Sequence, residues 1–326
     1  MNKKRIIAAI IILITAYFLL CSEEKKDRID NIISDVNTER KDSILFFPQF
    51  KRHQEFEAEE KLKISILRKE QGKNQPSKEK SDVNLSFTYS VNNITEDGMV
   101  IGRVTLNKAS AVTLRDGKKQ EITLTPISYK TNKDGVEQHN SKLLLTLLTN
   151  KHSIQISKIG RVTSLFLTNE LQQFLSEQGV DIESAIRMPF IEVPRNQIPT
   201  GTTWTVRQMV PLSTGSRATF LDFKSQFAGF KKHNDIDCAV VKIEAQDTLK
   251  YLPKNLLPKE EVKVHSLKIK VKGVAFFGIK EHFYIHQTYD IIFEAFALSP
   301  ETKTSTEPPE PTAVVNCLFE IDLKIK

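Results

Sequence analysis

The sequence predicts a mainly β protein of the α+β class, built as a curved antiparallel sheet or meander with one covering helix. Asp-Gly pairs begin at Asp97, Asp116 and Asp134. This dipeptide suits the positive φ angles of two-residue hairpin turns, and its regular recurrence indicates a meander of strands. Long C-terminal segments also alternate apolar and polar residues. The composition, with 40% hydrophobic and 27% charged residues among 326, is that of a globular body.

The N-terminus has the features of an export signal. Three basic residues at positions 3–5 precede an uncharged run that ends at Leu20. A membrane-spanning helix needs about 20 apolar residues, so this shorter run is typical of a secretory signal and predicts a signal peptide over 1–20. Cys21 follows directly, and we interpret it as a lipid attachment site. An uncleaved anchor and cleavage after Ala16 are alternatives, and all three place the folded body outside the cytoplasm.

A charged segment separates this signal from the body. Residues 21–42 carry many charges of both signs and few apolar residues, which predicts a flexible charged tether. The mainly β domain is predicted over 43–326. Apolar islands at 44–47 and 62–67 are expected to add a short helix or an edge strand, and residues 71–81 are expected to form a polar loop.

One helical pattern interrupts the strands. Leu171, Phe174 and Leu175 have the spacing of one helix face, which predicts a helix near 168–178. Residues 181–186 are expected to form a further short turn. A helix between sheet segments typically covers one face of the sheet.

The C-terminal half predicts antiparallel strands with one buried and one solvated face. Apolar residues take the odd positions over 283–295 and again over 317–325. The apolar phase changes within 264–267, which predicts a β-bulge near His265. Residues 299–311 are rich in Pro, Thr and Glu and are expected to form an exposed, disordered-like loop.

Few residues qualify as site candidates. Cys238 and Cys317 either form a disulfide or are two separate buried thiols. His282 and His286 would lie about 13 Å apart on a strand, too far for one metal ion. A basic stripe either contacts an anionic surface or is a solvated strand face; its members are Lys263, Lys268, Lys270 and Lys272.

Two local patterns resemble a known group of proteins. The signal that ends at Cys21 is similar to a bacterial lipoprotein signal, although Leu20 departs from the small residue usual before the cysteine. Gly201 and Trp204 form a Gly-x-x-Trp entry to a strand. Together they resemble uncharacterised bacterial envelope lipoproteins. The resemblance implies a lipid-anchored protein of the cell envelope, at the outer membrane on its periplasmic or surface face, and it implies no activity.

No catalytic motif is present in the sequence, so we expect no enzyme activity, cofactor or metal. Acid pairs such as Glu59 and Glu60 lie in charge runs and are expected to be solvated. The net charge of +7 is small for this length and gives no reason to expect nucleic acid as a partner. The main hypothesis is a non-catalytic interaction module for an envelope protein or polysaccharide. The alternative is a carrier of an apolar ligand, which needs an apolar cavity of about 300–1,000 Å³; a hydrolase is a minor alternative.

Overall fold

The structure is a computed structural model, and it describes part of the chain. The described ranges are 29–40, 42–68, 77–115, 118–124, 150–167, 182–210, 219–249, 264–297 and 313–325. The predicted signal peptide over 1–20, Cys21, Lys263, the helix near 168–178 and the loop over 299–311 all lie outside these ranges.

One large antiparallel sheet forms the body, so the predicted mainly β fold with a curved sheet is confirmed. Along its main path the strands follow the order β7-β6-β4-β3-β2-β14-β13-β12-β11-β10-β9, and β5 pairs with β4 beside β6. The first strands are β2 (Glu55–Arg68), β3 (Ser77–Ile94), β4 (Val100–Arg115), β5 (Lys118–Leu124), β6 (His152–Ile156) and β7 (Val162–Phe166). The others are β9 (Thr203–Val210), β10 (Thr219–His233), β11 (Ile236–Leu249), β12 (Val264–Gly278), β13 (Phe283–Ala297) and β14 (Ala313–Ile325).

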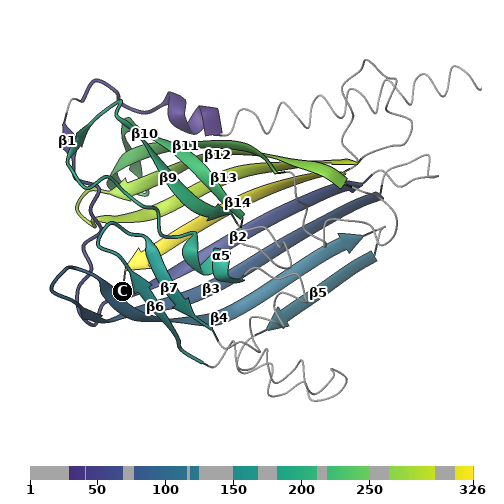
Figure 1. The fold of residues 1–326 in the computed structure, drawn as a ribbon, viewed down its shortest axis with the longest axis horizontal. Coiled ribbons are helices and arrows are strands. Elements are labelled where there is room, and N and C mark those ends of the chain that lie inside the picture. Colours follow the sequence, from purple (N-terminus) through teal and green to yellow (C-terminus); the bar gives the residue numbers. More distant parts are fainter. Residues whose placement is uncertain are drawn as a thin grey trace, which may run out of the picture.

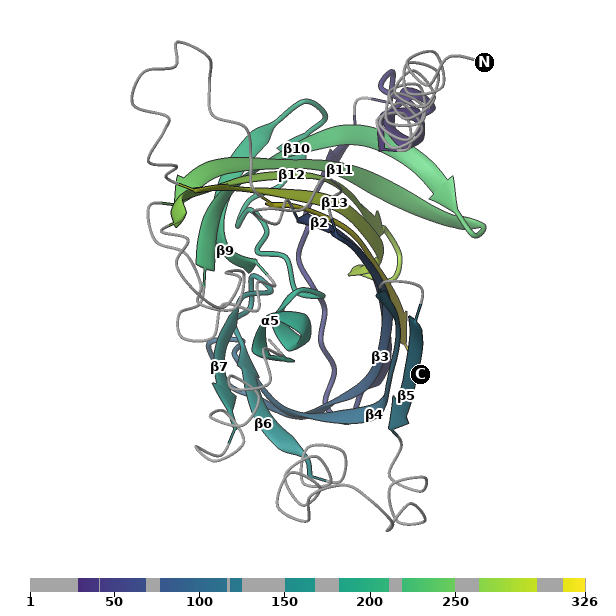
Figure 2. The same ribbon diagram turned by 90° about the vertical axis from the view of Figure 1, so that its right-hand side faces the viewer.

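The sheet curves strongly around its own interior. Figure 1 shows the long strands running side by side, and Figure 2 shows them end-on, with β7 and β9 brought to the same side of the molecule. The short helix α5 (Ile182–Arg187) lies within this concave interior, where the sequence predicted a short turn over 181–186. The sheet therefore has a concave face that packs inward and a convex face that points outward.

Strict alternation decides which residues enter the interior. On β14 the burial pattern alternates between buried and half-buried over most of the strand, so Phe319 and Ile321 point inward while Glu320 and Asp322 point outward. The same period of two runs through the neighbouring strands and gathers the apolar residues into one main core cluster. Burial of this apolar face stabilises the curved sheet.

Two register shifts interrupt the pairing of β12 with β13. The shift between Val264 and Ser266, where β12 pairs with β13, confirms the predicted bulge. A second shift lies between Phe276 and Phe277 of the same strand pair and was not predicted. Because of it, Ile285 packs with the cluster on the convex face, and the prediction that it shares the apolar face of Phe293 was wrong.

The apolar islands are more central than the sequence suggested. Residues 62–67 belong to β2, which pairs with both β3 and β14 and is therefore an interior strand of the sheet. The polar loop expected over 71–81 is shorter, because β3 already begins at Ser77. The island at 44–47 contributes only to β1 (Ser43–Ile44), which pairs with β8 (Ile198–Pro199).

The described part of the expected tether is packed against the convex face. Residues 29–34 are helical, and Ile29 and Val36 are buried with Val240, Val274 and others. The backbone of Asn37 then pairs with Phe230, with hydrogen bonds of 2.9 and 3.1 Å in the two directions. A flexible spacer is thus the wrong description for residues 29–40, which join the body instead.

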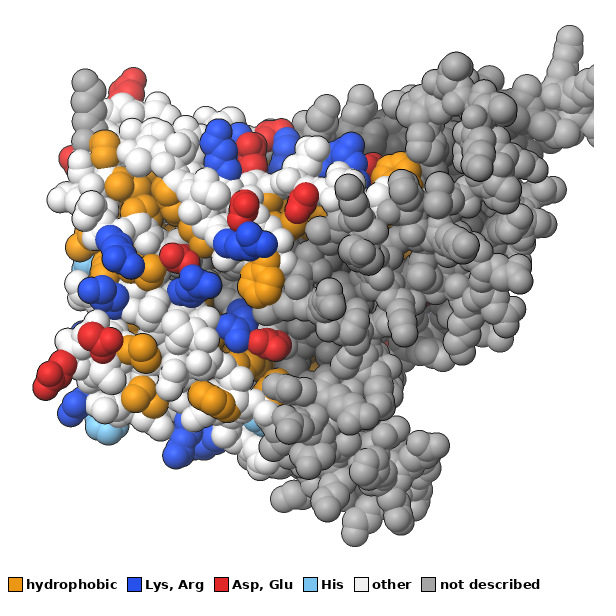
Figure 3. Space-filling model, in the orientation of Figure 1, with side chains coloured by type: hydrophobic (Ala, Val, Ile, Leu, Met, Phe, Trp, Pro, Cys, Tyr) orange, Lys and Arg blue, Asp and Glu red, His pale blue; other side chains and the backbone are white. Residues whose placement is uncertain are grey.

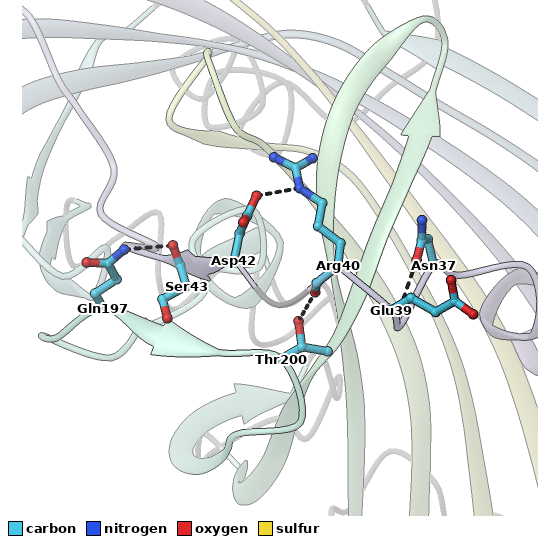
Figure 4. A network of polar contacts seen from close by, with 7 residues as sticks. All are labelled: Asn37, Glu39, Arg40, Asp42, Ser43, Gln197 and Thr200. Carbon is cyan, nitrogen blue, oxygen red and sulfur yellow. Dashed lines mark hydrogen bonds and ion pairs between the residues drawn. The ribbon is translucent and has the colours of Figure 1, made fainter.

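Polar contacts continue this attachment towards β1 (Figure 4). The Arg40 guanidinium lies 4.3 Å from the centre of the Phe230 ring and donates a 2.5 Å hydrogen bond to Asp42. Thr200 donates a 3.3 Å hydrogen bond to the Arg40 carbonyl, and Gln197 donates one of 2.7 Å to the carbonyl of Ser43. The chain is therefore held on both sides of the turn from the convex face to β1.

We expect Gly229→Ala to detach this segment. Gly229 has a φ of 144°, and a Cβ atom there would lie 2.5 Å from the Asn37 carbonyl oxygen. Strain of about 1–3 kcal/mol at such a backbone angle adds to the clash. Limited trypsin digestion should then cleave after Arg40 at a clearly higher rate than in the wild type. Gly201→Ala is the control, because Gly201 also has positive φ but nothing lies within 4 Å of its added Cβ; equal cleavage in both variants would contradict the prediction.

Candidate binding surface on the concave face

The concave face has one closed end. The irregular chain after β1 crosses it, with the Gln49 amide bonded to the His282 carbonyl (3.2 Å) and the His53 amide to that of Val91 (2.9 Å). Phe46 from this segment is fully buried, and Phe50 packs edge-on against Phe283 with ring centres 4.9 Å apart. These contacts fill the space between the ends of the strands and shut this side of the interior.

Away from this end, the floor of the concave face is aliphatic and only partly buried. The inward positions of β2 continue with Leu62, Ile64 and Ile66, and those of β3 and β4 with Leu85 and Ala109. All five are half-buried, whereas Phe56 and Phe87, nearer the closed end, are fully buried. Apolar surface therefore remains accessible along the inner face of the sheet on the side away from Phe46.

Polar side chains under α5 interrupt the apolar interior. The Tyr89 hydroxyl donates a 3.1 Å hydrogen bond to the Ile186 carbonyl of α5. The Gln287 amide donates one of 2.9 Å to the Pro189 carbonyl and accepts one of 2.9 Å from the Tyr289 hydroxyl. These bonds tie α5 and the chain that follows it to the floor of the sheet.

Glu60 is the exception among these interior polar groups. It is 1% exposed, and neither carboxyl oxygen has a hydrogen-bond partner among the described residues. On β2, Glu60 lies opposite Leu85 of β3 on one side and opposite Ile321 of β14 on the other. Gln287 of β13 is the next residue across the strands beyond Ile321. Burial raises the pKa of the Glu60 carboxyl well above its usual range. The expectation that Glu60 is solvated was therefore wrong.

The sequence does contain the signal for this burial. Phe56, Ala58 and Leu62 share the phase of Glu60, so alternation along β2 places its carboxyl on the apolar face. Glu59 has the opposite phase and is exposed. The surrounding run of charges obscured this two-residue period.

A second concavity lies where the two sides of the curved sheet approach each other. This cleft of about 390 Å³ is lined by parts of β7, β9 and α5. Arg187 donates hydrogen bonds to Glu183 (2.7 Å) and to the Val162 carbonyl (2.7 Å). On the face shown in Figure 3, basic, acidic and hydrophobic side chains are mixed. The cleft has the volume of a ligand site but a charged lining, unlike the apolar cavity that a carrier needs.

The two described cysteines do not meet. Cys238 belongs to the small cluster on the convex face, whereas Cys317 belongs to the main core inside the concave face. Both are buried and neither is in a disulfide bond, so the disulfide alternative does not hold. Burial raises the pKa of the Cys238 thiol to about 12, which keeps it protonated and unreactive at neutral pH.

The basic stripe lies on the convex face and has acidic neighbours. Lys270 lies 3.9 Å from Glu294 of β13, and Lys272 lies 3.7 Å from Asp30 in the helical segment over 29–34. Lys268 also pairs across the strands with Glu294. These contacts are those of a mixed, solvated surface more than of a free cationic patch.

The histidines take structural positions. His282 has a φ of 54° in the turn before β13. His286 is hydrogen-bonded through Nδ1 to Asp322 (2.7 Å) and through Nε2 to Thr288 (2.9 Å), and its ring stacks on His233. The hydrogen bond from His286 lowers the pKa of the Asp322 carboxyl. No group of three or more metal-ligating side chains occurs within the described ranges.

Trp204 is the last residue that the sequence singled out. Trp204 of the Gly-x-x-Trp pattern packs on Phe46, with ring centres 5.9 Å apart, and so lines the concave core.

Of the helices in the described part of the chain, none has the length and apolar character to span a bilayer.

Comparisons with known proteins give no family. No protein-family model and no curated protein matches the sequence. Lipovitellin, from a structure of lipid–protein interactions, is similar over 85% of this chain, with 9% identity and a TM-score of 0.48; the chain spans only 26% of that protein. The match to a DUF1329 family protein from Desulfovibrio piger covers 82% of this chain and 83% of that protein, with 10% identity and a TM-score of 0.10. Similarity at this level assigns no ligand to this chain.

Proposed function

We propose that this protein is a lipid-anchored envelope protein that binds an apolar ligand on its concave face, without catalysis. The single observation that carries the binding role is the accessible aliphatic floor formed by Leu62, Ile64, Ile66 and their neighbours on β3 and β4. An accessible apolar surface inside a curved sheet favours a hydrocarbon occupant, because each buried CH₂ group contributes about 0.8 kcal/mol.

The closed end supports a ligand that enters from one side. Phe46, Phe56 and Phe283 fill the space near the strand ends, so a hydrocarbon chain would extend from Glu60 towards Ile66. Ile64 is four residues beyond Glu60 and therefore lies about 13 Å further along the strand, at 3.3 Å per residue. This distance corresponds to the length of a medium acyl chain. An interaction module would bind its partner through the outer surfaces of the sheet. The lysines there already have acidic neighbours, so these surfaces offer less support for that hypothesis.

The binding role is tested with N-phenyl-1-naphthylamine, an uncharged apolar dye that fluoresces when it leaves water. We expect saturable binding to the delipidated full chain, weakened at least tenfold by Ile64→Asp. Lys63→Asp is the matched control, since Lys63 is the exposed neighbour on the convex face. No saturable dye binding, or equal loss in both variants, would favour the interaction module instead.

The anchoring part of the proposal rests on Cys21 at the boundary of the apolar run. Metabolic labelling with a fatty acid should mark the wild-type chain and leave Cys21→Ala unlabelled. Equal label in both chains would refute lipidation while leaving the ligand proposal untouched.

A further inference from the structure

We propose that the ligand is a single-chain amphiphile with a primary ammonium head, and that Glu60 binds this head inside the concave face. The inference rests on the proposed function and specifies its ligand class. Its starting point is a carboxyl group that is 1% exposed, points into the interior and accepts no hydrogen bond from a described residue.

A buried carboxyl in this state is costly for the fold. Leaving a buried polar group without a hydrogen bond costs about 1–3 kcal/mol, and a lone buried charge costs more. By contrast, Tyr89, Gln287 and Tyr289 all have hydrogen-bond partners near α5. Trp204 Nε1 and the Tyr284 hydroxyl of the same core also lack a partner, but among the described carboxyl groups only Glu60 has both oxygens buried without one.

The position of Glu60 matches the head of an amphiphile. It lies between the fully buried aromatic end, with Phe56 and Phe87, and the half-buried aliphatic floor that continues through Leu62 and Ile64. A head held at Glu60 would let its chain follow the inward side chains of β2. The hydrocarbon would then cover the part of the floor that the protein leaves accessible.

Charge complementarity selects an ammonium head. No described Lys, Arg or His forms an ion pair with Glu60, so the site offers an acid without its cation. An ammonium group would form charge-assisted hydrogen bonds with both carboxyl oxygens, which are about twice as strong as neutral ones. A hydroxyl or carboxylate head could not form an ion pair with the Glu60 carboxylate and would gain less.

Binding would then exchange a proton. Burial raises the pKa of Glu60, so the free protein keeps the carboxyl proton to a higher pH than an exposed glutamate does. An ammonium head ionises it, so the carboxyl proton leaves to the solvent and the ion pair forms. Binding should therefore release protons, up to one for each ligand, at any pH where the free carboxyl is still protonated.

The test uses decylamine, decanol and decanoate, which share one chain length and differ in the head. Each displaces N-phenyl-1-naphthylamine from the full chain, and calorimetry in buffers of different ionisation enthalpy counts released protons. We expect decylamine to bind at least tenfold tighter than either decanol or decanoate in the wild type. In Glu60→Gln the amine advantage and the proton release should both disappear, while affinity for decanol remains.

Glu59→Gln is the matched control, because it removes the neighbouring exposed carboxyl and should keep the preference for the amine. Retained affinity of Glu60→Gln for the dye shows that the variant is folded. If the dye binds but wild type and Glu60→Gln treat the three heads alike, or if decanoate binds best, the ammonium proposal is overturned and the carrier stands. If no probe binds the wild type, the carrier itself fails.

Discussion

Truncation of Phe46 to alanine should cost about 3–5 kcal/mol of the free energy of unfolding, the typical cost of removing a buried aromatic ring. Phe46 is fully buried and packs against Phe227 and Phe277, with ring centres 5.1 and 5.2 Å away. The segment that carries it is irregular and has only a few backbone hydrogen bonds to the strands, so the Phe46 ring is a main attachment of this segment to the core. Urea denaturation followed by circular dichroism measures the change.

Phe166→Ala provides the comparison for this prediction. Phe166 lies at the end of β7 and is 59% exposed, so its truncation should change the free energy of unfolding by less than about 0.5 kcal/mol. Similar losses in the two variants would mean that Phe46 does not close the concave face. A loss confined to Phe46→Ala would also predict faster proteolysis between β1 and β2.

Replacement of Glu60 by leucine should stabilise the fold, by at least about 1–3 kcal/mol at neutral pH, because it removes a buried carboxyl without a hydrogen-bond partner. The gain should depend on pH. Burial raises the pKa of Glu60 in the folded state, whereas the unfolded chain ionises it in its ordinary range. Raising the pH above that range therefore stabilises the unfolded wild type only.

The difference between Glu60→Leu and wild type should thus grow by about 1.4 kcal/mol per pH unit while the folded carboxyl stays protonated. It should shrink as the pH falls towards 4, where both states carry the proton. Urea denaturation at pH 4, 5, 6 and 7 measures it, and Glu59→Leu at an exposed position serves as the control. A difference that is constant across this range would mean that Glu60 is paired or solvated in the folded protein. If Glu60→Leu is more stable than the wild type but no longer prefers an amine, then Glu60 serves ligand binding at a cost in stability.

Local patterns in the sequence determined the fold class and several details of the sheet. The predicted turn at Asp97 is present, where Gly98 has a φ of 84° and joins β3 to β4. The phase change near His265 predicted the shift in register between Val264 and Ser266. Such features follow from the two-residue period of a strand and from the φ angles that glycine tolerates, and both properties belong to neighbouring residues.

Contacts between distant segments decided the rest. The charge density of residues 29–40 predicts a spacer, but the convex face offers Val240, Val274 and Phe276 to its few apolar residues and so holds it in place. The second register shift moves Ile285 outward, and this depends on how β12 pairs with β13. Glu60 is buried in the assembled sheet, where Leu85 of β3 and Ile321 of β14 lie on either side of it. The two-residue period of β2 places Glu60, and not Glu59, on the apolar face, but only the assembled sheet shows that this position is buried and leaves the carboxyl without a hydrogen-bond partner.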